Sequence, residues 1–155
     1  MKPFFDSTNQ SVLDAAATAW KGTPFATAGA VRGPRGGACC HRAVAGVLID
    51  AGFPLTQEEL PDWPLNRGTH HAQSVMLAWL REHRALFEEI SIEAIAPGDI
   101  VALLLGKSVH HMGLALPEDR FFQSWEGQGA HITRITDRQI SKRIEAAFRP
   151  IHPAS

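Results

Sequence analysis

Hydrophobic positions recur at helical spacing in the first half of the chain. Apolar residues at 13, 16, 17 and 20 share one helical face, and the sequence GTP at 22–24 ends that helix. From about Cys40 to Ala51 the chain is apolar almost all round, which predicts a buried central helix that Gly52 ends. A third helix is predicted over roughly Thr69–His83, where apolar residues keep the i, i+3, i+4, i+7 pattern.

The pattern changes after the Pro-Gly pair at 97–98. Four short β-prone runs follow, DIVALLL, VHHMGLAL, RFFQSW and AHITRI, with turn residues predicted at 106–108, 117–120 and 126–129. Between the second and third helices, residues 53–68 hold three prolines and are predicted to be a long connection. Helices followed by a meander of strands predict an α+β fold, with an antiparallel sheet packed on the helices.

Composition and charge narrow the class of protein. A chain of 155 residues with 45% hydrophobic and 20% charged residues is expected to form a single domain over 1–155. Its net charge of −1 and scattered basic residues argue against a nucleic-acid partner. The first ten residues, MKPFFDSTNQ, have no apolar run, so we expect neither a signal peptide nor a membrane anchor, and a protein that is cytoplasmic as synthesised.

The two cysteines, Cys39 and Cys40, are adjacent. Neighbouring Cα atoms lie about 3.8 Å apart, below the usual disulfide range of about 4.4–6.8 Å, so a bridge between them would be strained. They stand where a glycine-rich loop enters the predicted central helix, and a helix N-terminus stabilises the thiolate, the nucleophilic form of cysteine. One of them is therefore a candidate nucleophile, and the alternative is a pair of small buried hydrophobes.

A nucleophilic thiol needs a base, and the second β-prone run offers His110 and His111. Adjacent strand residues point to opposite faces, so one of the two can meet the thiol. His111 shares its face with Gly113 and Ala115, whose small side chains would let a helix end or a substrate approach. We therefore favour His111 as the base, with a structural core histidine as the alternative.

The eight histidines raise the question of a metal site. Two adjacent pairs, at 70–71 and 110–111, cannot direct both side chains to one ion from a helix or strand. No Cys-x₂-Cys or His-x₃-His spacing occurs. We therefore expect no metal and no other cofactor.

Five stretches carry a resemblance to a known family. AWKGTPF, GGACCHRAVAGVLIDAG, APGDIVAL, HHMGLAL and AAFRP are similar, in this order, to segments of the NlpC/P60 cysteine peptidases, over about Ala19 to Pro150. The resemblance implies a small papain-like α+β domain with the nucleophile at a helix N-terminus. It implies Cys40 as the nucleophile, His111 as the base and Gln123 as the residue that orients the imidazole.

Several positions depart from the family pattern. Phe25 stands where the family commonly has Tyr, Cys39 where it has Asp, and His41 with Arg42 replace the usual Ser-Gly. Phe25, His41, Arg42 and Trp125 are the expected substrate-binding residues. Arg42 would favour a substrate with a carboxylate, and the alternative is that it points to solvent from the first helical turn.

The activity implied by the resemblance is hydrolysis of an amide in peptidoglycan stem peptides, often between D-glutamate and a diamino acid. The expected partner is such a peptide, without membrane insertion. Delivery to the cell wall by a phage or secretion apparatus is one expectation, and an intracellular substrate is its alternative. One alternative is acyl transfer or deamidation through the same thiol on another substrate. Another is a binding module that keeps the cleft without activity.

Overall fold

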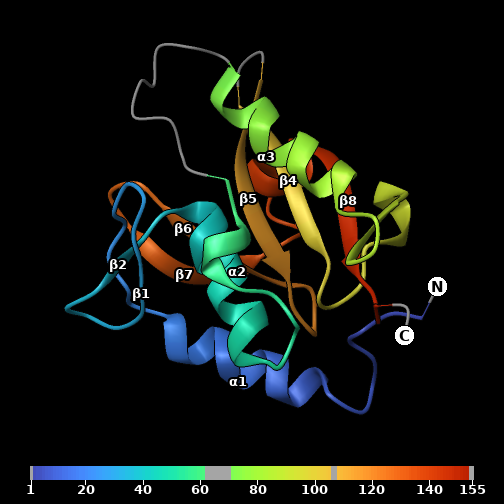
Figure 1. Cartoon of the computed structure of the whole chain (residues 1–155). Helices are drawn as coiled ribbons and strands as arrows, with labels where there is room; N and C mark the ends of the chain where they lie inside the picture. The colour runs from blue at the N-terminus through green and yellow to red at the C-terminus, as the bar shows by residue number, and fades with distance from the viewer. Residues whose placement is uncertain (1, 62–70, 106–107, 154–155) are drawn as a thin grey trace.

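The structure is a computed structural model that describes residues 2–61, 71–105 and 108–153, with the backbone alone at 71–74 and 108–110. Its helices are α1 (Gln10–Trp20), α2 (Cys40–Asp50), α3 (His71–Glu82) and α4 (Arg138–Ser141), with 3₁₀ turns η1 (Gln57–Glu59) and η2 (Ile92–Ala94). Its strands are β1 (Ala30–Val31), β2 (Gly37–Ala38), β3 (Phe87–Ile90), β4 (Ile100–Leu105), β5 (Ser108–Ala115), β6 (Arg120–Trp125), β7 (Gly129–Arg134) and β8 (Ile144–Pro150) (Figure 1).

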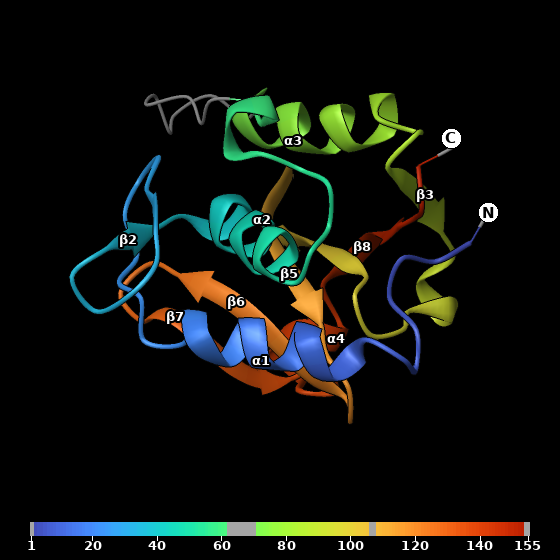
Figure 2. The same cartoon turned by 60° about the horizontal axis from the view of Figure 1, so that its bottom comes forward.

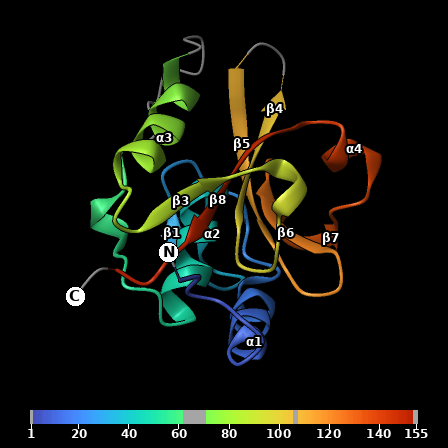
Figure 3. The same cartoon turned by 90° about the vertical axis from the view of Figure 1, so that its right-hand side faces the viewer.

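The described strands form a six-stranded antiparallel sheet in the order β3-β8-β4-β5-β6-β7, beside a small β1-β2 hairpin. Strands β4 to β7 are the meander that the four β-prone runs predicted, because each pairs antiparallel with the next in the sequence. The last strand, β8, returns to lie between β3 and β4 (Figure 3). The predicted α+β fold with an antiparallel sheet is confirmed.

Helix α2 is the central helix of the fold. It contacts β5 and β6 on one side and α1 on the other, while α3 lies over β5 (Figure 2). Trp20 locks α1 to α2, since its ring covers Gly46 so closely that a Cβ there would lie 2.1 Å from the indole. The indole Nε1 also donates to the Asp50 carboxylate at 2.8 Å. These contacts fix the position of α2 against the sheet.

The sheet is covered on both faces. The helical face carries one large core, in which Met112, Leu114 and Phe122 join the apolar residues of α1, α2 and α3. The opposite face carries a smaller cluster of Val101, Leu103, Ala115, Phe121 and Ile140. Alternate residues of β5 therefore belong to different clusters, as expected for a strand that is buried on both sides.

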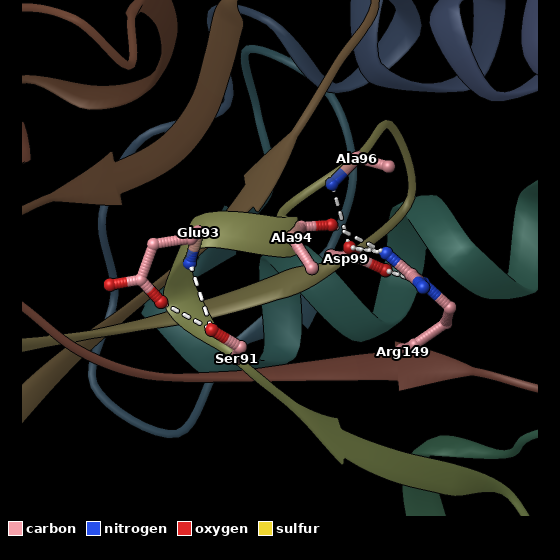
Figure 4. Close-up of polar contacts among 6 residues, drawn as sticks. All are labelled: Ser91, Glu93, Ala94, Ala96, Asp99 and Arg149. Carbon is pink, nitrogen blue, oxygen red and sulfur yellow. Dashed lines mark hydrogen bonds and ion pairs between the residues drawn. The ribbon is translucent and has the colours of Figure 1, made fainter.

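A partly buried ion pair joins Asp99, the residue before β4, to Arg149 near the end of β8 (Figure 4). Arg149 donates from Nε to one Asp99 oxygen at 3.0 Å and from Nη2 to the other at 2.9 Å, and it also reaches the Ala94 carbonyl at 2.8 Å. The Ala96 amide donates to the same carboxylate at 2.7 Å, and Ser91 bonds Glu93 at the start of η2. A two-point guanidinium–carboxylate contact of this kind fixes orientation as well as distance.

The sequence patterns did not predict β3 and β8. Strand β3 has only four residues, and its partner β8 lies more than fifty positions away in the sequence, so no local alternation marks the pair. The predicted central helix agrees with α2 to within one residue at its end. Three predicted features lie outside the described residues: the helix start at 69–70, the part of the connection after residue 61, and the turn at 106–107.

Membrane insertion through a helix finds no support in the described part of the chain. No helix there combines the length and apolar character that a bilayer crossing requires.

Candidate active site

Cys40 is the first residue of α2, and the loop before it is held by tertiary hydrogen bonds. The Ala38 amide donates to the Pro24 carbonyl at 2.9 Å, and the Ser124 hydroxyl of β6 donates to the Ala38 carbonyl at 2.8 Å. The start of α2 is thus tied both to the segment after α1 and to the sheet. This anchoring sets where the first turn of the helix meets the strands.

The thiol of Cys40 lies near the point where β5 and β6 stop pairing, which we call the fork. These strands pair only from Gly113–Gln123 to Ala115–Phe121, although both continue beyond Gly113 and Gln123 toward the N-terminus of α2. Beyond the last of these pairs, the backbone N–H of Met112 contacts the Cys40 thiol. The Cys40 thiol therefore contacts the strand residue that directly follows His111.

Burial dominates the electrostatics of Cys40. The residue is only 4% exposed, and burial raises the pKa of its thiol to about 12, with the neighbouring Cys39 adding to the rise. The backbone N–H groups of Met112, His41 and Cys40 itself lower the pKa, but by less. The resting thiol is therefore protonated at neutral pH and needs a base to become a nucleophile.

His111 is hydrogen-bonded to Gln123, the residue that the resemblance implied beside it. Its Nε2 lies 2.7 Å from Gln123 Oε1, and the edge of its ring faces the Trp125 ring with centroids 4.6 Å apart. Burial lowers the pKa of His111 to about 4, and the bond to Gln123 offsets only part of this. The imidazole is therefore neutral at pH 7 and able to accept a proton.

The structure places His111 and Cys40 near the same fork without a direct bond. Within the described residues, the hydrogen bonds of His111 reach neither cysteine thiol. Proton transfer between them therefore requires a rearrangement on substrate binding, since catalytic hydrogen bonds often tighten only in the complex with substrate.

The second thiol, Cys39, has its own histidine. Its Sγ lies 3.5 Å from His41 Nδ1, and each residue is 2% exposed. Burial raises the pKa of Cys39 and lowers that of His41 to about 4. His41 also lines a small apolar cavity between α2 and α3, with Val44 and Met76 among its neighbours. This pair is enclosed in the interior, and the expected substrate-binding position of His41 does not lie on an open surface.

Arg42 does not point to solvent from the first helical turn. It is 8% exposed, and its Nη1 donates to the Gln57 carbonyl at 2.9 Å and to the Gln57 side-chain oxygen at 3.2 Å. The Gln57 amide in turn donates to the Arg42 carbonyl at 3.0 Å. Arg42 thus joins α2 to η1, so we do not carry its expected substrate contact into the proposed function.

The other two expected substrate contacts lie closer to the fork. Phe25 is partly buried. Its two sequence neighbours, Pro24 and Ala26, form backbone hydrogen bonds with Ala38, two residues before Cys40. Trp125 is partly buried against the His111 ring.

The small residues beside His111 have a different role from the one expected. Phe121 fills the space over Gly113, where a Cβ would lie 1.9 Å from the phenylalanine ring. The helices instead cover the face of Met112 and Leu114. The small residues beside His111 thus face Phe121 and not a helix, and the side chain of His110, the rival base, is outside the described part.

An open groove of about 290 Å³ is lined by Gln123 and Trp125 of β6 and by His131 of β7. Asp137 and Arg143, which flank α4, also line it. Its lining is mainly polar, with amides, a hydroxyl and one charge of each sign. This surface can hold a polar, extended ligand beside the His111–Gln123 pair.

One residue of this site, His131, was missed by the sequence analysis. Its Nε2 lies 3.1 Å from Gln123 Nε2, because β6 and β7 pair Gln123 directly with His131. The predicted turn at 126–129 contained the necessary signal. Counting outward from that turn along both strands places a residue near 131 opposite Gln123.

Comparison with known proteins gives the fold. No protein-family model matches the sequence, and no curated protein does. Solved structures match: an NLP/P60 family protein of Staphylococcus aureus, described as similar to a lipoprotein, is 21% identical, with a TM-score of 0.62 over 97% of this chain and 44% of that one. The NlpC/p60 domain of the peptidoglycan hydrolase SagA is 16% identical, with a TM-score of 0.58 over 90% of this chain and 97% of that domain. The chain has the NlpC/P60 fold.

The NlpC/P60 fold hosts both active and inactive proteins. RipD of Mycobacterium tuberculosis, a non-catalytic NlpC/p60 protein adapted to peptidoglycan binding, is 11% identical, with a TM-score of 0.58 over 95% of this chain and 99% of that one. The chain also spans less than half of the Staphylococcus aureus protein. Activity must therefore be argued from the site itself.

Among the described residues, no group of three or more His, Cys, Asp or Glu side chains could hold a metal ion.

Proposed function

We propose that this protein is a cysteine hydrolase in which Cys40 is the nucleophile, His111 the base and Gln123 the residue that orients the base. The observation that carries the proposal is the 2.7 Å bond between His111 and Gln123 at the fork where the Cys40 thiol lies. The neutral resting states of both groups favour general-base activation over a preformed thiolate–imidazolium pair.

In the first half of the reaction, the Cys40 sulfur attacks the carbonyl carbon of a bound amide. His111 takes the thiol proton as the S–C bond forms, and the carbonyl oxygen becomes an oxyanion. The backbone N–H groups at the start of α2, those of Cys40 and His41, are suited to stabilise this charge. Collapse of the tetrahedral intermediate then breaks the C–N bond, and His111 gives its proton to the leaving amine.

In the second half, water attacks the thioester. His111 accepts a proton from the water, and the intermediate collapses to a carboxylic acid with release of the Cys40 sulfur. The proton on His111 returns to that sulfur, which restores the neutral pair. Gln123 keeps the ring in one orientation through both halves because its oxygen bonds Nε2 and leaves Nδ1 available.

The substrate class we propose is the peptidoglycan stem peptide. Two neighbours of the same fold are described as a peptidoglycan hydrolase and a peptidoglycan-binding protein. The polar groove next to Gln123 and Trp125 fits an extended peptide with amide and carboxylate groups. The bond between D-glutamate and a diamino acid is the first to test.

A peptidoglycan-binding domain without catalysis is the second candidate. The observation that favours it is the burial of Cys40, which is 4% exposed with a pKa raised to about 12. RipD combines the same fold with a non-catalytic role.

One experiment separates the two candidates. The purified chain is incubated with peptidoglycan sacculi, and both the released peptides and the bound protein are measured, with Cys40→Ser and Cys39→Ser as matched variants. Hydrolysis predicts new peptide termini by mass that Cys40→Ser loses and Cys39→Ser keeps. Co-sedimentation without released peptide would support the binding domain, and the absence of both would overturn peptidoglycan as the substrate.

A further inference from the structure

A chain of hydrogen bonds runs from His111 to a backbone carbonyl. His111 Nε2 lies 2.7 Å from Gln123 Oε1, and Gln123 Nε2 lies 3.1 Å from His131 Nε2. His131 Nδ1 then lies 2.9 Å from the Gly129 carbonyl oxygen. Each bond has one donor and one acceptor, so the groups at the two ends are not independent.

The carbonyl sets the direction of this chain. A carbonyl oxygen only accepts, so His131 Nδ1 must carry the hydrogen, and in a neutral ring Nε2 is then an acceptor. That acceptor takes a hydrogen from the Gln123 amide, which turns Oε1 toward His111. His111 must therefore carry its hydrogen on Nε2, which leaves Nδ1 as the only basic nitrogen of the ring.

The opposite orientation of the Gln123 amide would give His111 the tautomer in which Nδ1 carries the hydrogen and cannot accept a proton. With Oε1 toward His131, that histidine would need hydrogens on both nitrogens and hence a positive charge. The Gln123 NH₂ would then donate to His111 Nε2 and force the hydrogen onto Nδ1. The charged groups that share the groove with His131 are Asp137 and Arg143, one of each sign.

The carbonyl at the end of the chain is itself held in place. Gly129 has φ 72°, and a Cβ there would lie 2.5 Å from the Thr23 carbonyl oxygen, so only glycine fits. The next residue, Ala130, donates to the Thr23 carbonyl at 2.7 Å and accepts from the Gly22 amide at 2.9 Å. The turn after α1 thus fixes the start of β7.

We propose that His131 is a positioning residue that sets the orientation of the Gln123 amide and, through it, the tautomer of His111. The proposal deepens the proposed function, on which its catalytic consequence rests. His131 does not touch the reacting atoms. It makes His111 Nδ1 the acceptor that a general base requires.

The tautomers can be measured without substrate. Long-range ¹H–¹⁵N spectra of histidine-labelled protein at pH 7 should show His111 with its hydrogen on Nε2 and His131 with its hydrogen on Nδ1. In His131→Phe, which keeps a ring but has no acceptor, the His111 tautomer ratio should shift about fivefold toward Nδ1–H, the worth of one net hydrogen bond. In His131→Gln, whose amide oxygen can accept from Gln123, the ratio should stay close to that of the wild type.

Several results would overturn the proposal. They are a wild-type His111 that carries its hydrogen on Nδ1, a wild-type His131 that carries its hydrogen on Nε2, and an unchanged ratio in a folded His131→Phe. The wild-type spectra decide the matter even if the phenylalanine variant does not fold.

The failure of this proposal is distinguishable from the failure of the proposed function. If sacculi are hydrolysed, His131→Phe should lower kcat by up to about fivefold, because the tautomer of the base changes, whereas His131→Gln, which alters the same groove lining, should keep kcat within about twofold of the wild type. Hydrolysis with an unchanged tautomer would overturn the positioning role alone. The expected tautomers without any hydrolysis would support the positioning role and overturn the proposed function.

Discussion

Two cysteines that are neighbours in the sequence have different surroundings. Cys39, the residue before α2, meets His41 in the first turn of that helix, and both are 2% exposed in the interior. Cys40 meets the backbone of Met112 at the β5–β6 fork, one residue from a histidine that is bonded to Gln123. The Cys39–His41 contact forms within three consecutive residues, whereas the surroundings of Cys40 depend on the pairing of strands.

The difference separates a thiol–imidazole contact from a catalytic arrangement. The thiol–histidine contact that the structure shows belongs to Cys39, yet His41 lines a small apolar cavity. Gln123, which bonds His111, lines an open groove. A nucleophile needs an oriented base and a path for substrate, so the Gln123 bond and the groove beside it favour the Cys40 side.

The largest expected effect is on the nucleophile. Cys40→Ser should lower the rate of peptide release by about 10³-fold or more, since the attacking group is replaced by a much weaker one. Cys39→Ser should stay within about tenfold of the wild type. Rates on sacculi, or on a soluble stem peptide, measure both. A greater loss from Cys39→Ser would exchange the roles of the two thiols.

The two histidines should differ almost as much. His111→Ala should lower kcat by about 10²–10⁴-fold, the usual worth of a general base. His41→Asn keeps a polar atom near Cys39 and should change kcat by less than about tenfold. Thermal melts of both variants ensure that rates are compared between folded proteins. Equal losses from the two variants would refute the assignment of His111 as the base.

Both buried histidines should make the fold sensitive to acid. Each has a folded pKa lowered to about 4 by burial, below an ordinary value near 6.5, so the unfolded chain binds more protons between these values. Stability is therefore fully present above about pH 6.5 and falls as the pH drops toward 4, by about 3 kcal/mol for each histidine.

Urea unfolding at pH 7 and at pH 4.5 measures this loss. His41→Asn and His111→Asn should each remove part of the difference between the two pH values, and the double variant should remove more than either. A pH dependence equal to that of the wild type in both single variants would show that other groups cause it.

The smallest expected effect concerns Arg42. Arg42→Met breaks the bonds to Gln57 and should lower the free energy of unfolding by about 1–3 kcal/mol. Because the side chain is held inside the fold, kcat/KM for an acidic stem peptide and for its amidated counterpart should change by the same factor. A selective loss on the acidic peptide would restore Arg42 as a substrate contact.

Much of the fold was predictable from local patterns. Helix α2 and strand β6 follow from apolar periodicity and turn residues close to their observed bounds, because both signals lie within a dozen residues. Strands β3 and β8 were not predicted, because β8 is a strand by virtue of two partners that lie far from it in the sequence.

The site was predictable to a lesser extent. The pairing of His111 with Gln123 was expected from the resemblance, and the structure shows the bond. The face of β5 that meets the helices was not predicted correctly, because Phe121, from the next strand, occupies the space over Gly113. Arg42 was expected to contact the substrate, with a solvent-facing side chain as the alternative; the structure shows it 8% exposed and bonded to Gln57 of η1.

The sequence by itself determined the elements and the chemistry available to them: an apolar helix that begins at a cysteine, and a strand that carries a histidine. Periodicity and residue type are properties of short segments, so they need no partner to be recognised. The tertiary structure decided which of the two buried thiols meets the sheet, and which histidine is oriented by an amide and a second imidazole. Those relations depend on strand register and on where β5 and β6 separate, and a shift of one residue in register would exchange the two faces.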